Sequence, residues 1–139
     1  MQLNLKTDYA LRVLMILAAK DEVASIDWIA DQYGISRNHL AKVAQALSAS
    51  GFIETLRGRN GGIRLARPPE EINVGDVVRK LENVEGFVAC MGGNANCSID
   101  GLCGLKPALA GALEAFLSHL DRFNLAQITG NRTRFLEFI

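Results

Sequence analysis

The sequence predicts a mainly α-helical fold with a small β-hairpin, in which a winged helix-turn-helix is followed by a long C-terminal dimerisation helix. Two observations lead to this fold class. Three segments with apolar residues at helical spacing precede two short alternating segments joined by a glycine-rich turn. A further long segment with a wide apolar stripe follows the winged domain. We therefore expect the winged domain over residues 1–82, a loop over 83–104, and the dimerisation helix with a tail over 105–139.

The first three expected helices form the helix-turn-helix. They cover Tyr9–Lys20, Ile26–Tyr33 and Arg37–Ala49. Ser25 and Ser36 stand directly before the second and third helices, where a side-chain oxygen can accept a hydrogen bond from a free backbone N–H group. Gly34 stands where helices commonly end in a left-handed residue. Two helices joined by a short turn that contains glycine are typical of a helix-turn-helix.

The wing and two further helices follow. The alternating segments Phe52–Leu56 and Ile63–Ala66 flank an Asn-Gly dipeptide at position 60, which is the strongest short signal for a β-hairpin. Asn73 is expected to cap a helix of about nine residues. A long helix is expected over Leu105–Leu120. Its apolar stripe favours burial against a second copy of the chain, and packing on its own domain is the alternative.

The composition is that of a globular protein. Of the 139 residues, 49% are hydrophobic and 22% are charged, which excludes a largely disordered chain. The longest apolar run, Val13–Ala19, is far shorter than the roughly 20 residues of a membrane span, and we find no secretion signal. We therefore expect a cytoplasmic protein with no membrane partner, in a reducing compartment where clustered thiols tend to bind metal.

Basic residues gather in the predicted helix-turn-helix and wing, although the net charge of the chain is zero. Residues 36–67 contain six basic residues and one acidic residue, a net charge of +5. Residues 68–139 contain six basic and nine acidic residues, a net charge of −3. One basic face on a neutral protein suits contact with phosphates, and an ordinary solvated surface is the alternative.

The residue types in the basic segment favour double-stranded DNA as its ligand. The third helix begins with Ser-Arg-Asn-His, and the first residues of such a helix enter the major groove, where arginine can bind guanine and asparagine can bind adenine. Arginines flank the turn of the hairpin, from which they can reach phosphates or the minor groove. The candidate DNA-binding residues are Ser36, Arg37, Asn38, His39, Lys42, Arg57, Arg59 and Asn60.

The three cysteines of the chain lie close together. Cys90, Cys97 and Cys103 form a C-x6-C-x5-C pattern in a glycine-rich segment, without the C-x2-C pair of zinc fingers. This wide spacing suits an iron–sulfur cluster, and we expect [4Fe-4S] rather than [2Fe-2S]. The fourth ligand then has to be another residue, a small molecule or a group from a partner chain. The alternatives are three structural cysteines, or a zinc site completed by His119.

Three motifs extend this pattern over nearly the whole chain. They are Thr-Asp-Tyr-Ala-Leu-Arg from Thr7, Gly-Ile-Ser-Arg-Asn-His from Gly34, and Arg-Gly-Arg-Asn-Gly-Gly-Ile-Arg-Leu from Arg57. With these motifs and the three cysteines, the chain resembles the Rrf family of iron–sulfur winged-helix transcription regulators, most closely its NsrR-type nitric-oxide-sensing repressors. The resemblance implies a homodimeric repressor that binds a pseudo-palindromic operator with its cluster intact and releases the operator when nitric oxide attacks the irons.

The resemblance also implies a fourth cluster ligand and a subgroup. Some NsrR-type members use an aspartate at the position of Asp8, supplied by the other subunit. From the residues alone, Asp8 can also be a helix cap or an ion-pair partner of Arg12. Lys106 stands where the family's regulators of cluster assembly carry histidine, which argues against their type of site. Gly104 is a departure, because NsrR-type members often have arginine there.

Other functions stay open at this point. One is an iron- or redox-responsive regulator of the same family, and another is a zinc-stabilised winged-helix module that binds DNA. We do not expect an enzyme or an electron carrier, because the sequence offers no paired catalytic carboxylates, no nucleophile–base pair and no phosphate-binding glycine loop. The polar tail after Thr129 has no functional interpretation.

Overall fold

The computed structural model describes residues 1–93 and 96–139, and this part of the chain is mostly helical with a two-stranded antiparallel hairpin. The elements in order are α1 (Leu5–Lys20), α2 (Ile26–Tyr33), α3 (Arg37–Ala49), β1 (Ile53–Leu56), β2 (Gly62–Leu65), η1 (Pro69–Glu71), α4 (Val74–Leu81), η2 (Asp100–Leu102), α5 (Leu105–Leu120), α6 (Leu125–Thr129) and α7 (Arg132–Glu137). The expected fold class is confirmed. Positions 94 and 95 of the expected loop lie outside the described residues.

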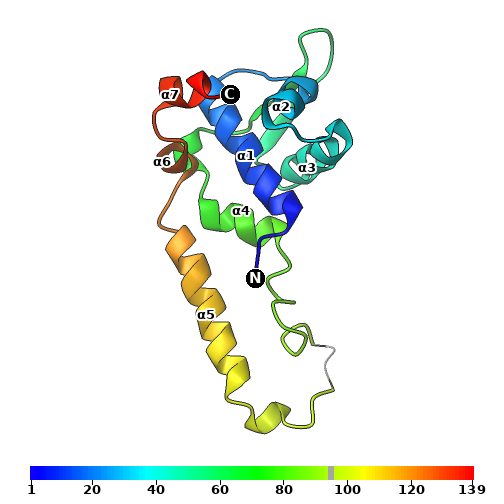
Figure 1. The fold of residues 1–139 in the computed structure, drawn as a ribbon, viewed down its shortest axis with the longest axis vertical. Coiled ribbons are helices and arrows are strands. Elements are labelled where there is room, and N and C mark those ends of the chain that lie inside the picture. Colours follow the sequence, from blue (N-terminus) through cyan, green and yellow to red (C-terminus); the bar gives the residue numbers. More distant parts are fainter. Residues whose placement is uncertain (94–95) are drawn as a thin grey trace.

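α1 is the central helix of the winged module, the name used here for residues 1–82, and packs against α3, α4, α6 and α7 (Figure 1). Its fully buried apolar side chains are Ala10, Val13, Leu14, Ile16 and Leu17. Each buried leucine or isoleucine contributes roughly 1.5–3 kcal/mol, so this face anchors the core. The helix begins at Leu5 rather than at Tyr9, because Oδ1 of Asn4 accepts a hydrogen bond from the N–H group of Thr7 and caps it.

The helix-turn-helix ends and begins at its predicted signals. Gly34, with a φ of 62°, ends α2, and Ser36 caps α3. β1 starts at Ile53 rather than at Phe52 because the amide of Phe52 donates to the carbonyl oxygen of Leu47 in α3. This hydrogen bond therefore fixes the direction in which the chain runs from the end of α3 into the hairpin.

The root of the wing is tied to the segment before α2. Ala24 and Ile63 form an isolated bridge, in which the N–H group of Ala24 donates at 2.9 Å and its carbonyl oxygen accepts at 2.8 Å. In the hairpin itself, Glu54 lies directly opposite Arg64. The wing and the helix-turn-helix therefore form one unit with a fixed mutual orientation.

α5 projects from the module as an arm, and the segment after α4 runs out to meet its far end (Figure 1). In the described chain α5 packs mainly against α4, and Leu117 is its one buried residue. The apolar stripe predicted for this helix is thus largely exposed in a single chain, with Leu105 at 64% exposure. None of the helices in the described chain combines the length and the hydropathy that a bilayer crossing demands.

The C-terminal tail returns to the winged module, since α6 and α7 pack against α1. Nε of Arg132 donates to the carbonyl oxygen of Ala19 at 3.1 Å, and its Nη2 lies 3.2 Å from Oδ2 of Asp21. A cation at this position complements the negative end of the α1 dipole. The tail therefore closes the C-terminal end of the central helix.

Candidate nucleic-acid interface and cysteine loop

The first turn of α3 presents a group of exposed polar side chains. Ser36, Arg37, Asn38 and His39 are all exposed, and Lys42 is exposed one turn further along. Oγ of Ser36 accepts a hydrogen bond from the N–H group of His39 at 3.2 Å, so this hydroxyl also caps the helix. Five of the predicted DNA-binding residues thus lie together at one end of α3, clear of its buried stripe.

Two of the basic residues in this region are paired within the chain. Nε of Arg37 forms an ion pair with Oδ1 of Asp27 on α2. Nη2 of Arg64 lies 3.0 Å from Oε2 of Glu54 across the hairpin. The Glu54–Arg64 contact follows from the hairpin register, but nothing local in the sequence indicates the Asp27–Arg37 contact. Both acidic partners lower the effective positive charge of the face.

The other cations keep their charge available. Among the described residues, Lys42, Arg57 and Arg59 have no ion-pair partner. All three are exposed, on the second turn of α3 and at the tip of the wing. Arg67 is also exposed, but its guanidinium lies over the ring of Phe52, 5.5 Å from the ring centroid. Lys42, Arg57 and Arg59 are therefore the cations in this region that can reach phosphates without breaking a contact within the described chain.

The turn of the wing requires glycine for an internal reason. A Cβ on Gly61 would lie 2.3 Å from the carbonyl oxygen of Leu56, and a Cβ on Gly62 would lie 2.3 Å from that of Ala24. Side chains cannot approach a backbone oxygen so closely, so both positions need glycine whether or not DNA is bound. The tight turn leaves three predicted residues exposed: Arg57, Arg59 and Asn60.

A tyrosine behind this face ties α2 to α1. The hydroxyl of Tyr33 donates to the carbonyl oxygen of Arg12 at 2.9 Å. Burial raises the pKa of Tyr33 to about 12, while the charge of Arg12 acts in the opposite direction. The phenol therefore stays protonated and remains a donor at neutral pH. The sequence offered no signal for this contact, because the two residues belong to different helices.

The three cysteines are free thiols, of which Cys97 is exposed and Cys90 and Cys103 are half-buried. Within residues 1–93 and 96–139, no group of three or more histidine, cysteine or acidic side chains is gathered as a metal site. Nζ of Lys106 lies 2.8 Å from Oδ1 of Asp100. This hydrogen bond and the charge of Asp100 raise the pKa of Lys106, and the thiols of Cys90 and Cys103 act in the same direction. The charge of Lys106 is thus compensated by Asp100 within the same part of the chain.

The donor chemistry of this loop fits an iron–sulfur cluster. Thiolates are the usual protein ligands of such clusters. α5 begins two residues after Cys103, so the positive end of its dipole lies next to this thiol. His119 lies in the last turn of α5, about 21 Å along the helix axis from Leu105. It therefore cannot complete a zinc site with Cys103 of the same chain.

Asp8, the predicted fourth ligand, lies in the first turn of α1 and pairs with Arg12. Nε of Arg12 donates to Oδ1 of Asp8 at 3.2 Å, and its Nη2 lies 3.0 Å from Oδ2. The interpretation of Asp8 as a helix cap is wrong, because Asn4 caps α1. α1 begins inside the winged module, whereas the loop after α4 extends away toward the far end of α5 (Figure 1). In the described part of a single chain, Asp8 is not gathered with the cysteines into a group that could hold a metal ion.

The winged module, the cysteine loop and α5 together match one protein-family model, over residues 3–131. This model describes Rrf2, an iron-dependent transcriptional regulator. The chain belongs to the Rrf2 family. The resemblance inferred from the motifs is thus confirmed.

Two curated relatives are similar to this Rrf2 protein over nearly its whole length. The HTH-type transcriptional regulator NsrR of Bacillus licheniformis is 48% identical over 135 residues, which cover 95% of this chain and 94% of the relative. The HTH-type transcriptional regulator NsrR of Bacillus subtilis is 46% identical over 142 residues, which cover 100% of this chain and 97% of the relative. This Rrf2 protein is accordingly a transcriptional regulator and not an enzyme.

Solved structures of other regulators share the fold. IscR of T. potens is 25% identical with a TM-score of 0.73, and the match covers 92% of this chain and 85% of IscR. CymR, the global cysteine regulator of B. subtilis, is 24% identical with a TM-score of 0.73, and the match covers 93% of this chain and 96% of CymR. Both likenesses extend beyond the winged module into the segment that carries the cysteines and α5.

Proposed function

We propose that this Rrf2 protein is a nitric-oxide-sensing transcriptional repressor that binds operator DNA as a homodimer with an iron–sulfur cluster and releases the DNA when nitric oxide reacts with the cluster. The observation that carries the proposal is the identity of 46–48% with two NsrR regulators over nearly the whole chain. The three free cysteines between α4 and α5 support it, because they supply thiol donors for a cluster.

The DNA-binding part of this proposal is the first turn of α3 together with the wing. The hydrogen bonds between Ala24 and Ile63 hold these two elements in one unit, so both can face the same duplex. We assign the contacts to Ser36, Arg37, Asn38, His39, Lys42, Arg57, Arg59 and Asn60. Within the proposed division of the chain, these residues belong to a DNA-binding domain over residues 1–82.

The homodimer in this proposal forms through α5. Leu105 is 64% exposed and Leu102, just before the helix, is 92% exposed. Exposed apolar side chains that recur along one helix favour burial in an interface. An apolar groove next to α5, between the N-terminal segment and α4, is lined by Met1, Leu3, Val78, Phe87, Leu113 and Phe116. A second copy of α5 can cover this surface, and two winged modules then suit a pseudo-palindromic operator.

The cluster in this proposal, [4Fe-4S] rather than [2Fe-2S], is held by Cys90, Cys97 and Cys103 of one subunit and by Asp8 of the partner subunit. When bound, it supplies iron atoms that react with nitric oxide. The chain's own part is to offer three thiol ligands from one short segment, Cys97 exposed and the other two half-buried. A ligand on α1 of the partner connects the cysteine loop to the helix on which the winged module is built.

One alternative stays within the family. The description of Rrf2 as an iron-dependent regulator is compatible with a protein of the same fold and cluster that responds to iron or to redox state. A zinc-stabilised module is less well supported, because His119 and Cys103 lie at opposite ends of α5.

The deciding experiment is an absorption spectrum of anaerobically purified protein, followed by titration with nitric oxide while operator binding is measured in parallel. The proposal predicts straw-brown protein whose spectrum changes and whose operator is released over the same range of nitric oxide. Release by iron chelation or by oxidant, without release by nitric oxide, identifies the other regulator. Colourless protein that contains zinc contradicts the cluster altogether.

A further inference from the structure

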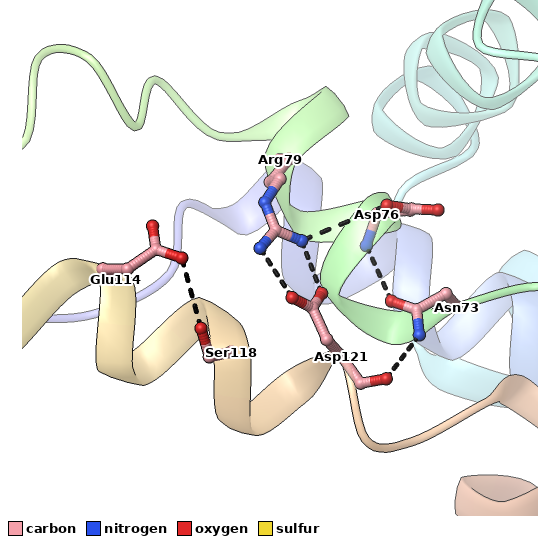
Figure 2. Close-up of polar contacts among 6 residues, drawn as sticks. All are labelled: Asn73, Asp76, Arg79, Glu114, Ser118 and Asp121. Atoms are coloured by element: carbon pink, nitrogen blue, oxygen red, sulfur yellow. Dashed lines mark hydrogen bonds and ion pairs between the residues drawn. The ribbon is translucent and has the colours of Figure 1, made fainter.

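A two-point ion pair joins α4 to the end of α5 (Figure 2). Nη1 of Arg79 donates to Oδ1 of Asp121 at 2.5 Å, and Nη2 donates to Oδ2 at 2.7 Å. Asn73, which caps α4, also donates from Nδ2 to the carbonyl oxygen of Asp121 at 2.7 Å. The hydrogen bond from Arg79 holds the pKa of Asp121 below its usual range.

The close approach of Asp121 depends on a glycine in α4. A Cβ on Gly75 would lie 1.9 Å from Oδ1 of Asp121 and 3.0 Å from Nη1 of Arg79. Glycine is unfavourable inside a helix relative to alanine, because it loses more backbone freedom. Gly75 is thus unfavourable for the helix, but any side chain at this position would collide with the carboxylate of Asp121.

Two backbone hydrogen bonds also connect the start of α4 to the segment that follows α5. The N–H group of Val74 donates to the carbonyl oxygen of Phe123 at 3.0 Å, and the N–H group of Leu125 donates to that of Ile72 at 2.8 Å. These bonds fix where the end of α5 meets the start of α4. Arg79 lies further along α4 than Val74. Its bond to Asp121 is therefore a second contact between the two helices, which opposes rotation of α5 about the first contact.

The other end of α4 is fixed to α1. The two carboxylate oxygens of Glu82 accept hydrogen bonds from the N–H group and from Nδ2 of Asn4, at 2.8 and 2.9 Å. α4 therefore connects the cap of α1 to the base of α5, and α5 packs mainly against α4. The joint between Arg79 and Asp121 therefore lies on the path that connects α5 to α1.

We propose that Arg79 and Asp121 are positioning residues that fix the direction of α5 on the winged module and thereby set the spacing of operator half-sites that the dimer accepts. This inference rests on the proposed function, because it needs two modules that are joined through α5. The second module binds at a high effective concentration only when its half-site is within reach. Each added base pair moves a half-site by about 3.4 Å along the duplex and about 35° around it, so a rigid arm distinguishes neighbouring spacings.

The test is binding to operators with altered spacing. The probe is a duplex that the wild-type protein selects from random sequence, with its centre then lengthened or shortened by one, two or five base pairs. Wild-type protein is expected to lose affinity at each altered spacing. Asp121→Asn keeps the shape of the side chain but removes its charge. We expect the ratio of affinities for the selected and the altered spacing to fall at least about fivefold in this variant. Affinity for a single half-site should stay unchanged.

Two further variants separate positioning from stability. Gly75→Ala displaces the Asp121 carboxylate while it favours the helix, so it should relax the spacing preference without lowering the melting temperature. Ser118→Ala is the matched control, because it removes only the 3.2 Å hydrogen bond to Glu114 within α5, drawn in Figure 2. It should keep the wild-type spacing profile.

The outcomes distinguish the two proposals. A wild-type preference for one spacing that Asp121→Asn and Gly75→Ala both retain overturns the positioning role and leaves the proposed function intact. Wild-type protein that binds one half-site as tightly as two overturns dimeric operator binding, and this inference with it. A relaxed profile in both variants, with a wild-type profile in Ser118→Ala, supports the positioning role.

Discussion

Arg37, the first residue of α3, is held by Asp27 from the first turn of α2. The two side chains are 71% and 64% exposed. A pair this exposed contributes only roughly 0–1 kcal/mol to stability, so its consequence lies in what it does to Arg37. To bind a base, Arg37 has to leave Asp27 or carry a negative charge toward the phosphates. Asp27 therefore weakens binding to DNA in which Arg37 finds no matching base, because no base contact then offsets the loss of the ion pair.

The Asp27–Arg37 pair gives the first prediction. Arg37→Ala should reduce discrimination between operator and random DNA by about 1–3 kcal/mol at one base position. Asp27→Asn should raise the affinity for random DNA, because it removes a negative charge beside the interface. Competition binding at fixed salt measures both effects. An equal loss on both DNAs in Arg37→Ala would show that this arginine contacts phosphate instead of a base.

The wing offers a matched pair of arginines. Arg59 has no ion-pair partner in the described chain, whereas Arg64 is bound to Glu54. Arg59→Ala should weaken binding evenly across sequences and make the slope of log affinity against log salt shallower by about one unit. Arg64→Ala should change this slope less, because its charge is already compensated. Anisotropy titrations over a range of salt test this, and equal slopes for the two variants contradict the assignment.

The helices were predictable where their signals are local. Ser25 and Ser36 cap α2 and α3 at the predicted positions because a cap involves only a side chain and a backbone group within three residues. Asn73 caps α4 for the same reason. The predicted start of α1 at Tyr9 is four residues too late, although Asn4 is a cap residue by type. An apolar stripe begins to repeat only after the first turn, so it locates the middle of a helix better than its end.

Contacts between distant segments were not predictable. Arg79 and Asp121 are 42 residues apart, and each is an ordinary surface residue in its own segment. The tail gave no functional signal, yet Arg132 reaches back to the end of α1. The DNA-binding candidates could be found because they follow from the fold itself, namely the start of a recognition helix and the tip of a wing. The periodicity of apolar residues in one chain does not indicate which residue of a second chain lies near the cysteines.

The cysteines should be separable from the fold. Cys90→Ala, Cys97→Ala and Cys103→Ala should each remove the stable cluster and the response to nitric oxide. Helical content should change little, because the buried core residues of the described chain all lie outside the loop. Absorption and circular dichroism spectra of anaerobically prepared protein measure the two effects. A variant that keeps full cluster absorbance identifies a cysteine that is not a ligand.

Stability at high pH should depend on Tyr33. Because burial raises its pKa to about 12 from an ordinary value of 10.0, the folded state holds the phenol proton more tightly than the unfolded state does. This contribution is fully present below pH 10 and is lost as pH rises toward 12, so the free energy of unfolding should fall over that range. Tyr33→Phe should flatten this fall, and Tyr9→Phe serves as the control. Urea unfolding midpoints measured against pH test this, and parallel curves for Tyr33→Phe and wild type contradict it.

Asp8 is the candidate whose role depends on the second subunit. In one chain it is bound to Arg12, and both side chains are substantially exposed. Such a pair contributes roughly 0–1 kcal/mol, so removing Asp8 should cost the fold little. A change in the cluster after its removal can then be attributed to lost ligation and not to unfolding. Arg12→Ala is the control, because it breaks the same ion pair and leaves the carboxylate in place.

We expect Asp8→Ala to change the absorption spectrum of the anaerobically reconstituted cluster and the dependence of operator release on nitric oxide. Asp8→Cys should hold the cluster through four sulfurs, because thiolate is the usual ligand of iron in such clusters. Carboxylate oxygen is a harder donor that binds such iron less often, which leaves the iron it holds more open to attack. Spectra and release that stay at wild-type values in both variants would leave Asp8 as the ion-pair partner of Arg12. The fourth ligand would then have to be water or a small thiol.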